Sequence, residues 1–471
     1  MFSSHASGHP DPNLEDLARS FIRKSTFSNA RMTNETSTVY AQFRGTPNED
    51  RFTVSEDWEL SDHVWQFIAV FDGNFLTANI SSSSQVVVTG HGGSTTADYL
   101  AKHFTSHLRR SMELSFSYTP ESTPSPNPPV LQLLSTARSR SNDTPVILFT
   151  NKNISEFLKR QVRAFDEDLG KAVKEICPNP ESLSDKEAHA LYEAHKMVIA
   201  RARCGSTMAG ILLDKTERRM WVCCVGDSSV VLSTKSPISD RRKAVLLNQH
   251  HTAQSPQEYH RVTMAHPSHE RDKIWLDGEE RIFGTLSMTR AFGDFMYKFP
   301  TSFTATLFSK FPSTAMRSVN RVLSYNRTPP YVISDPFVTF VDLTAFSEDE
   351  DPAVIIYSDG LEALASRLSI AAMNKGISDV SGSSDAVPTA VDIIGAFLGQ
   401  PLDLAALPSS LTDIFPNNNA AFNLISNLLD RAIPKKLRAH LESMRNDDGN
   451  DDEELYIDDV TVIVFKLFTA P

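Results

Sequence analysis

The sequence predicts an α+β fold, and three observations support this class. Short apolar runs rich in β-forming residues lie near both ends of the chain, helical patterns lie between them, and no internal repeat is present. The length of 471 residues alone would allow about three domains. Strands at both ends with helical stretches between them instead favour one domain over residues 35–468, with inserts, preceded by a flexible N-terminal segment over residues 1–34.

Four stretches have the composition of strands, at residues 64–71, 209–232, 353–357 and 460–465. The first and the third are nearly all apolar, which predicts buried strands. They lead into the Asp-Gly pairs Asp72-Gly73 and Asp359-Gly360. In the second stretch, short apolar runs alternate with turns, as in antiparallel strands. We therefore expect rigid strands to position acidic side chains at their ends.

Helical periodicity marks residues 94–112, 158–176 and 421–429. The second of these stretches places apolar residues at steps of three and four, the pattern of an amphipathic helix that packs against a core or a sheet. Prolines among serines predict a loop or disordered insert over about residues 113–150, and a Gly/Ser-rich linker follows at 376–387.

The composition restricts the function. Lys and Arg number 46 against 58 Asp and Glu, and the net charge of −12 argues against nucleic acid as a partner, since its phosphates are repelled. No apolar run approaches the ~18 residues of a membrane span, and the N-terminus lacks the apolar core of a signal peptide. Four cysteines are too few for a disulfide framework, so we expect reduced core cysteines in an intracellular protein. Acidic residues interrupt the basic N-terminal segment, which leaves the mitochondrial matrix, the cytoplasm and the nucleus all open.

Acidic residues gather where the predicted strands begin or end. They are Asp72, Asp227 and Asp359 after strands, Asp458 just before the last strand, and Glu49-Asp50 before the first. Carboxylates that converge on one point repel each other unless cations lie between them. Oxygen ligands without added Cys or His favour Mg²⁺ or Mn²⁺, and a pair of such ions can polarise a phosphoryl oxygen. A simple Asp-Gly turn is the alternative at any single position, but the shared context of these acids favours a metal site.

Seven motifs, in order across about residues 40–466, resemble those of the metal-dependent protein serine/threonine phosphatases of type 2C. They are Asn48-Glu49-Asp50-Arg51; Phe71-Asp72-Gly73 with His91-Gly92-Gly93; Cys204-Gly205-Ser206-Thr207; Val225-Gly226-Asp227-Ser228; the run from Leu286 to Asp294; Ser358-Asp359-Gly360-Leu361; and Asp458-Asp459 with the strand that follows. Finer matches resemble the pyruvate-dehydrogenase-phosphatase-like branch of this family. They are His251-Thr252-Ala253-Gln254, Ala265-His266-Pro267, the run from Arg290 to Lys298, and Thr328 to Pro336.

The resemblance implies a central antiparallel β-sandwich flanked by helices, with the metal site at the edge of the sandwich. It implies hydrolysis of phosphoserine or phosphothreonine in a protein substrate by a metal-bound hydroxide, with two ions of Mg²⁺ or Mn²⁺ and a third at Asp227. The positions that match the family's metal ligands are Glu49, Asp50, Asp72, Gly73 (through its carbonyl), Asp227, Asp359 and Asp458. His91 matches the histidine proposed as general acid, and Arg44 or Arg51 is the expected phosphate-binding arginine. The branch further implies a mitochondrial dehydrogenase complex as partner.

The sequence departs from the family at the first Asp-Gly turn. Residues 74–90, a Ser-rich stretch followed by three valines, separate Asp72-Gly73 from His91-Gly92-Gly93. Two explanations stay open: a translated, retained intron, or a genuine loop whose ends meet, because closing a loop costs little more as it lengthens. Either way His91 loses its covalent placement, so a catalytically impaired binding or regulatory protein is the alternative function. Ala363 also follows Glu362 where the family usually has an acid, unless Glu362 substitutes for it.

Two other polar groups allow weaker interpretations. Five histidines between His250 and His269 could form a zinc site, but their irregular spacing without a cysteine favours surface or structural roles. The acidic stretch from Asp447 to Glu454 could bind Ca²⁺, but it lacks the ligand spacing of an EF-hand, so we expect a solvated loop.

Overall fold

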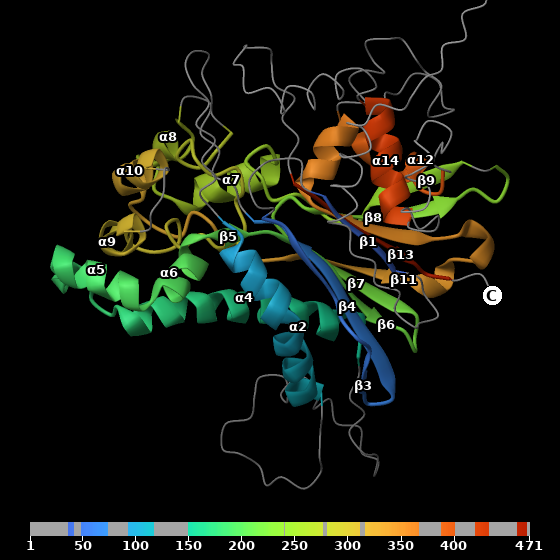
Figure 1. The fold of residues 1–471 in the computed structure, drawn as a ribbon, viewed down its shortest axis with the longest axis horizontal. Helices are drawn as coiled ribbons and strands as arrows, with labels where there is room; N and C mark the ends of the chain where they lie inside the picture. The colour runs from blue at the N-terminus through green and yellow to red at the C-terminus, as the bar shows by residue number, and fades with distance from the viewer. Residues whose placement is uncertain are drawn as a thin grey trace, which may run out of the picture. The chain divides into compact units, whose positions relative to one another are not determined.

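The computed structural model describes residues 36–41, 49–73, 93–116, 149–239, 241–276, 280–310, 316–366, 388–400, 420–432 and 459–468, whose elements Figure 1 labels. The chain divides into two compact units. The first unit combines Met1–Asp50, Ser229–Leu247 and Phe346–Pro471, and the second combines Arg51–Ser228 and Asn248–Ala345. Each unit is therefore assembled from segments that are distant in the sequence.

The first unit contains a five-stranded antiparallel sheet with the strand order β1-β13-β12-β8-β9. Its strands are β1 (Thr36–Ala41), β8 (Ser229–Lys235), β9 (Arg242–Leu246), β12 (Ala353–Tyr357) and β13 (Val460–Lys466). The helices α12 (Ala390–Phe397) and α14 (Ala420–Ala432) share one apolar cluster with alternate residues of β12 and β13, including Ile355 and Val462. All five residues of β12 are buried, as its apolar composition requires at the centre of a sheet.

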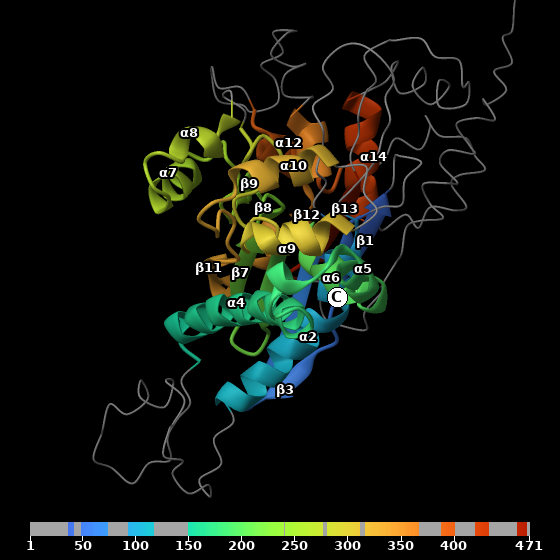
Figure 2. The same ribbon diagram turned by 90° about the vertical axis from the view of Figure 1, so that its left-hand side faces the viewer.

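The second unit contains a six-stranded antiparallel sheet with the order β11-β7-β6-β4-β2, in which β3 also pairs with β4. Its strands are β2 (Arg51–Val54), β3 (Trp58–Leu60), β4 (His63–Phe71), β6 (Met208–Asp214), β7 (Arg219–Val225) and β11 (Phe337–Asp342). The helices α2 (Thr95–Phe116) and α4 (Asn151–Ile176) lie beside each other in Figure 2 and share an apolar cluster with β4. Phe67 and Phe104 within it are fully buried, each worth about 1.5–3 kcal/mol of transfer free energy.

Shorter elements complete the second unit around a separate apolar cluster that contains Phe283, Tyr297 and Tyr331. The two-residue strands β5 (Gly205–Ser206) and β10 (Phe292–Gly293) pair with each other. The helices are α5 (Asp185–Ala194), α6 (Lys196–Arg203), α7 (Pro256–Ala265), α8 (Arg271–Ile274), α9 (Thr301–Thr306) and α10 (Met316–Tyr325). Single 3₁₀ turns occur at Pro180–Ser182, Phe308–Lys310 and Leu343–Ala345, and at Glu348–Glu350 in the first unit.

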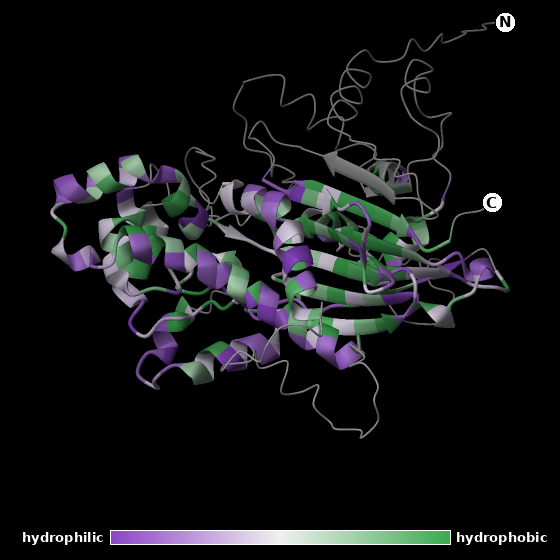
Figure 3. Ribbon diagram, turned by 90° about the horizontal axis from the view of Figure 1, so that it is seen from below, coloured by the Kyte–Doolittle hydropathy of each residue, from purple (hydrophilic) through white to green (hydrophobic). Residues whose placement is uncertain are grey.

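Every predicted strand and helix in the described residues is present, which confirms the α+β class. Figure 3 shows the strands as mainly hydrophobic and the helices as mixed, in agreement with the patterns read from the sequence. The predicted start of a loop at residue 113 is wrong, because α2 continues to Phe116. Met112 and Phe116 are both buried in the cluster with β4, and the first proline comes only at Pro120, so nothing ends the helix earlier.

The remaining predicted segments lie mostly outside the described residues. These are the N-terminal segment 1–34, residues 74–90, the rest of the insert up to residue 148, and the linker 376–387. The four cysteines are described, and all are buried and free of disulfides, as predicted. Within the described ranges, no helix is both long enough and apolar enough to cross a membrane.

Candidate metal site

The ends of β4 and β7 bring two of the predicted metal ligands together. Both strands pair with β6 in antiparallel fashion, so they run parallel to each other and end at the same edge of the sheet. Asp72 follows β4, and Asp227 follows β7 after Gly226. Both side chains are half-buried, and a carboxylate oxygen of Asp72 lies within 4.8 Å of one of Asp227 in an acidic cluster. Oxygen donors at this spacing suit a hard divalent cation such as Mg²⁺ or Mn²⁺.

Thr207 connects the two turns that carry these aspartates. Its backbone N–H donates to the carbonyl of Asp72 at 2.9 Å, and its hydroxyl lies 2.7 Å from the hydroxyl of Ser228, the residue after Asp227. The neighbouring Ser206 forms a β-bridge with Gly73. Thr207 and Ser206 are both buried, so they hold the two turns from the interior of the protein. The motif Cys204–Thr207 therefore supports the acidic edge without supplying a carboxylate to it.

The position of Gly226 requires glycine, both for its small size and for its backbone conformation. Its φ of +99° lies in the left-handed region, and a Cβ at this position would lie 2.5 Å from Cγ2 of Thr207. His251 contacts the same residue twice: the N–H of Gly226 donates to Nδ1 of His251 at 3.1 Å, and the N–H of His251 donates to the carbonyl of Gly226 at 2.9 Å. The turn before Asp227 is thus fixed on both sides.

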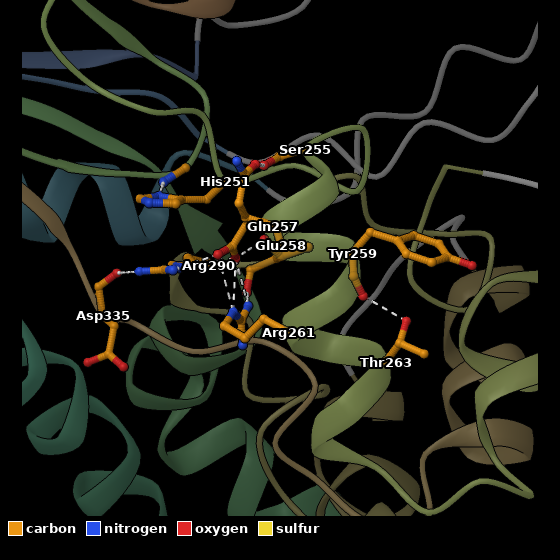
Figure 4. A network of polar contacts seen from close by, with 11 residues as sticks. His251, Ser255, Gln257, Glu258, Tyr259, Arg261, Thr263, Arg290 and Asp335 are labelled. Atoms are coloured by element: carbon orange, nitrogen blue, oxygen red, sulfur yellow. Dashed lines mark hydrogen bonds and ion pairs between the residues drawn. The ribbon is translucent and has the colours of Figure 1, made fainter.

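A buried polar network behind this turn centres on Glu258 of α7 (Figure 4). Glu258 is 4% exposed. Its carboxylate accepts hydrogen bonds from Arg261 at 2.8 Å, from Arg290 at 2.5 Å and from the hydroxyl of Thr289 at 2.6 Å. The backbone N–H of Thr289 in turn donates to the carbonyl of His251 at 2.8 Å. One carboxylate therefore joins α7 to the segment that packs against His251.

Burial and charge set the protonation of this network. Burial of His251, together with the positive charge of Arg290, lowers its pKa to about 3, so the imidazole is neutral at pH 7. A neutral ring agrees with Nδ1 acting as an acceptor for Gly226. Burial acts to raise the pKa of Glu258, but hydrogen bonds from Arg290, Arg261 and Thr289 outweigh it and hold the pKa at about 2. Glu258 is therefore ionised between its two arginines.

The acidic motifs of the first unit form a connected group of their own. The hydroxyl of Ser358 donates to the carboxylate of the buried Asp50 at 2.6 Å, and this hydroxyl accepts from the N–H of Thr461 at 2.9 Å. The N–H of Glu49 donates to the side chain of Asp459 at 2.8 Å. The start of β13, the end of β12 and the Glu49-Asp50 pair therefore meet, with Asp359 next to Ser358 in the sequence.

Gly360, which follows Asp359, is needed for this meeting. A Cβ on Gly360 would lie 2.2 Å from the backbone oxygen of Asp459. The Asp-Gly pair after β12 is thus more than a turn signal, because glycine allows the two chain segments to approach.

Several predicted site residues lie outside the described residues, namely Arg44, His91 and Asp458. The two ends of the interruption are described: Gly73 bridges to Ser206, and a Cβ on Gly93 would lie 3.8 Å from Sγ of Cys204. Both flanks thus lie against the same short segment. The alternative arginine, Arg51, forms an ion pair with the exposed Asp98, so a phosphate there would compete with a carboxylate.

A family model described as protein phosphatase 2C matches residues 142–386, just over half of the chain. The chain belongs to the protein phosphatase 2C family. A protein phosphatase 2C homologue of Schizosaccharomyces pombe is 25% identical over 316 residues, which cover 67% of this chain and 56% of the relative. A probable protein phosphatase 2C of Oryza sativa subsp. japonica is 30% identical over 158 residues, which cover 33% of this chain and 26% of the relative.

The chain therefore spans little more than half the length of the first of these relatives. Among solved structures, a serine-threonine phosphatase 2C from Toxoplasma gondii aligns with 94% of this chain and 98% of its own length, at 14% identity and a TM-score of 0.42. A sex-determining protein of C. elegans aligns with 93% of this chain at 16% identity and a TM-score of 0.43.

Two buried carboxylates in this phosphatase 2C chain were not predicted from the sequence. Glu258 is one, although a glutamate three residues before Arg261 on a helix is the signal that could have found it. The other is Asp166 of α4, which is 4% exposed, pairs with Lys298 at 2.7 Å and accepts the N–H of Gly293 at 2.8 Å. Both carboxylates bind the run from Arg290 to Lys298, which lies 32 residues after Glu258 and more than 120 residues after Asp166 in the sequence.

Two of the five histidines considered as a zinc site have structural roles. His251 and His266 are buried, and the ring of His266 stacks on Tyr331 at 3.9 Å while its Nδ1 lies 2.9 Å from the hydroxyl of Thr328. In the described part of the chain, the histidines between His250 and His269 form no group with the geometry of a metal site. The acidic stretch Asp447–Glu454 lies outside the described residues.

Proposed function

We propose that this protein is a metal-dependent protein serine/threonine phosphatase. The observation that carries the proposal is the pair of carboxylates of Asp72 and Asp227 at one sheet edge, in a chain of the phosphatase 2C family. Phosphorylated proteins are then the substrate class. Because the chain spans only part of its relatives' length, both the activity and the substrates of the whole protein belong to this proposal.

Two ions of Mg²⁺ or Mn²⁺ are proposed to bind the acidic residues at the strand ends, with a third ion at Asp227. The full proposed ligand set is Glu49, Asp50, Asp72, the carbonyl of Gly73, Asp227, Asp359 and Asp458. When bound, such ions supply Lewis-acid polarisation of a phosphoryl group and activate water for attack. The donor set fits this assignment, since it offers oxygen atoms only and the two carboxylates at the sheet edge lie close enough to share a cation.

The chain's own residues would bind and orient the substrate around these ions. His91 is the proposed general acid that gives a proton to the leaving serine or threonine oxygen, and Arg44 is the proposed phosphate ligand. Arg51 is the alternative, and its ion pair with Asp98 would have to open to admit phosphate. Thr207 and Gly226 fix the turns of the two acids, which limits reorganisation at the site.

The arrangement of the two sheets is also part of the proposal. We infer that they pack as a β-sandwich flanked by helices, with the metal site at its edge. Its support is that both sheets are antiparallel, that helices share an apolar cluster with each of them, and that acidic motifs follow strands in both.

We further propose that the chain falls in the pyruvate-dehydrogenase-phosphatase-like branch. Its support is that the finer motifs contact one another: Nδ1 of His266 lies 2.9 Å from the hydroxyl of Thr328, and the N–H of Tyr331 donates to the carbonyl of Tyr297 at 2.9 Å. A mitochondrial dehydrogenase complex as partner and the mitochondrial matrix as compartment would follow from this branch. Imaging of the tagged full-length chain tests the compartment.

The alternative, a catalytically impaired binding protein, is not favoured. Its basis is the interruption of the Asp-Gly-His-Gly-Gly turn by residues 74–90. The retained carboxylates Asp72 and Asp227 and membership of a phosphatase family favour the enzyme.

Release of phosphate from a phosphothreonine peptide tests the proposed function. We expect the full chain to release phosphate with Mn²⁺ and to stop when a chelator removes it. Asp72→Asn should lower the rate by at least about 10²-fold, as loss of a charge-stabilising group at an active site does. Glu167→Gln, at an exposed position of α4, is the matched control and should leave the rate unchanged. A metal-independent rate, or a rate unaffected by Asp72→Asn, would contradict the proposal.

A further inference from the structure

His251 occupies a position between the acidic edge and the network around Glu258. It is 2% exposed and follows Asn248, whose side-chain amide donates to the carbonyl of Ser228 at 3.1 Å. Residues on both sides of Asp227 are therefore held from the same short segment, Gly226 by His251 and Ser228 by Asn248.

The segment with His251 is braced from behind. The N–H of Thr289 donates to the carbonyl of His251, and the N–H of Ala253 donates to the carbonyl of Ser287 at 3.1 Å. Thr289 is fixed in turn by Glu258 through its hydroxyl and by Arg261, which donates to its carbonyl at 3.1 Å. Figure 4 shows the side chains of Arg290 and Arg261 meeting that of Glu258, with His251 above Arg290. A shift of α7 would thus be transmitted to the turn that carries Asp227.

We propose that His251 is a positioning residue that holds the Gly226-Asp227 turn in its metal-binding conformation, with Glu258 fixing His251 from behind. The proposal rests on the proposed function in one respect, because it takes Asp227 to be a metal ligand. The role requires an acceptor atom at the place of Nδ1, since the N–H of Gly226 points there and is buried. Without that acceptor, the N–H is left unsatisfied and the turn loses one of its two contacts with His251.

The expected effect is a weaker metal site with an intact fold. Residues that orient metal ligands typically contribute 10–100-fold to metal affinity. His251→Ala should therefore raise the dissociation constant for Mn²⁺ by about 10–100-fold. His251→Asn should stay within about 3-fold of wild type, because its side-chain oxygen can take the place of Nδ1. At saturating Mn²⁺, the KM for a phosphopeptide should not change in either variant, as His251 does not contact substrate.

Electron paramagnetic resonance of free Mn²⁺, titrated into the full chain without substrate, measures this affinity independently of turnover. His266→Ala is the matched control: His266 is 4% exposed and hydrogen-bonded through Nδ1, but its partner is Thr328 and not the metal turn. It should bind Mn²⁺ as wild type does. If His251→Ala does not fold, His251→Leu, which fills the space and lacks the acceptor, takes its place.

The outcomes separate the two proposals. If His251→Ala or His251→Leu binds Mn²⁺ as tightly as wild type, or if His251→Asn loses as much affinity as they do, the positioning role is wrong. If wild type binds Mn²⁺ and the variants behave as expected but no phosphopeptide is hydrolysed, the positioning role stands and the proposed activity fails.

Discussion

Replacement of Glu258 by alanine perturbs the most highly connected buried carboxylate of the α7 network. Its side chain accepts hydrogen bonds from Arg261, Arg290 and Thr289, and it is 4% exposed. Its removal leaves two guanidinium groups without the charge that both contact. Breaking a buried ion pair in this way costs about 3–5 kcal/mol. Since the side chains of Arg261 and Arg290 remain 27% and 19% exposed, we expect the low end, about 3 kcal/mol.

The pKa of Glu258 leads to an estimate of the same size. A fall from 4.5 in the unfolded chain to about 2 in the folded protein corresponds to at most about 3 kcal/mol. Because the folded-state pKa is the lower one, this stabilisation is complete above pH 4.5 and is lost as the pH falls from 4.5 towards 2. Glu258→Gln keeps the shape without the charge, so it should remove this part of the pH dependence.

Urea unfolding followed by tryptophan fluorescence measures the loss. The four tryptophans, Trp58, Trp65, Trp221 and Trp275, all belong to the second unit, so their emission reports on the unit that contains Glu258. At pH 7 we expect Glu258→Ala to lower the free energy of unfolding by about 3 kcal/mol. The exposed-site control Glu167→Ala should stay within about 0.5 kcal/mol of wild type. A loss below about 1 kcal/mol for Glu258→Ala would refute the reasoning, since the arginines would then not depend on this carboxylate.

Three further predictions concern other parts of the second unit. Asp166→Ala should lower the free energy of unfolding by about 3–5 kcal/mol, because it leaves the Lys298 ammonium, whose side chain is 7% exposed, without its carboxylate partner. Adding Lys298→Met to this variant should restore part of the lost stability, and equal losses in the single and double variants would contradict this pairing. Gly226→Ala should lower the free energy of unfolding by at least about 2 kcal/mol, from its φ of +99° and the contact with Thr207, and a neutral result in the same urea assay would count against the turn geometry. Deletion of residues 74–90 should preserve folding, because both flanks lie against Cys204–Ser206. It should raise phosphatase activity by up to about 10²-fold, because it restores the placement of His91. Equal activity of the two forms would show that the interruption is harmless. Sequencing of the transcript across codons 70–95 separates a retained intron from a genuine loop.

The elements that the sequence predicts well are those whose periodicity is strong. The apolar run that forms β4 and the spaced apolar residues of α4 each point to one structure. β4 begins one residue before the predicted start, whereas α4 ends at the predicted Ile176 but begins at Asn151, seven residues before the predicted start. The end of α2 was misplaced, because polar residues around position 113 gave no sign that Phe116 would be buried. The order of the strands could not be predicted, since pairing such as β1 with β13 joins residues from opposite ends of the chain.

In the candidate site, too, some residues could be predicted from the sequence and others could not. Asp72 and Asp227 could be predicted as partners from their places after apolar strands, although only the sheet order explains why they end at one edge. The roles of Glu258 and Asp166 could not, because their partners lie on other elements and a buried charge leaves no pattern along the chain. The sequence places His251 in a family motif and among the five neighbouring histidines, but its contact with Gly226 depends on backbone geometry that composition does not encode.

Calorimetric titration of Mn²⁺ into the full chain, and into the variant that combines Asp72→Asn with Asp227→Asn, tests the central claim most directly. We expect wild type to bind Mn²⁺ at this acidic edge and the double variant to lose that binding, because neutral amides neither attract the cation nor replace both carboxylates. Equal binding by the two proteins, or no binding by wild type, would contradict the assignment of this edge as a metal site.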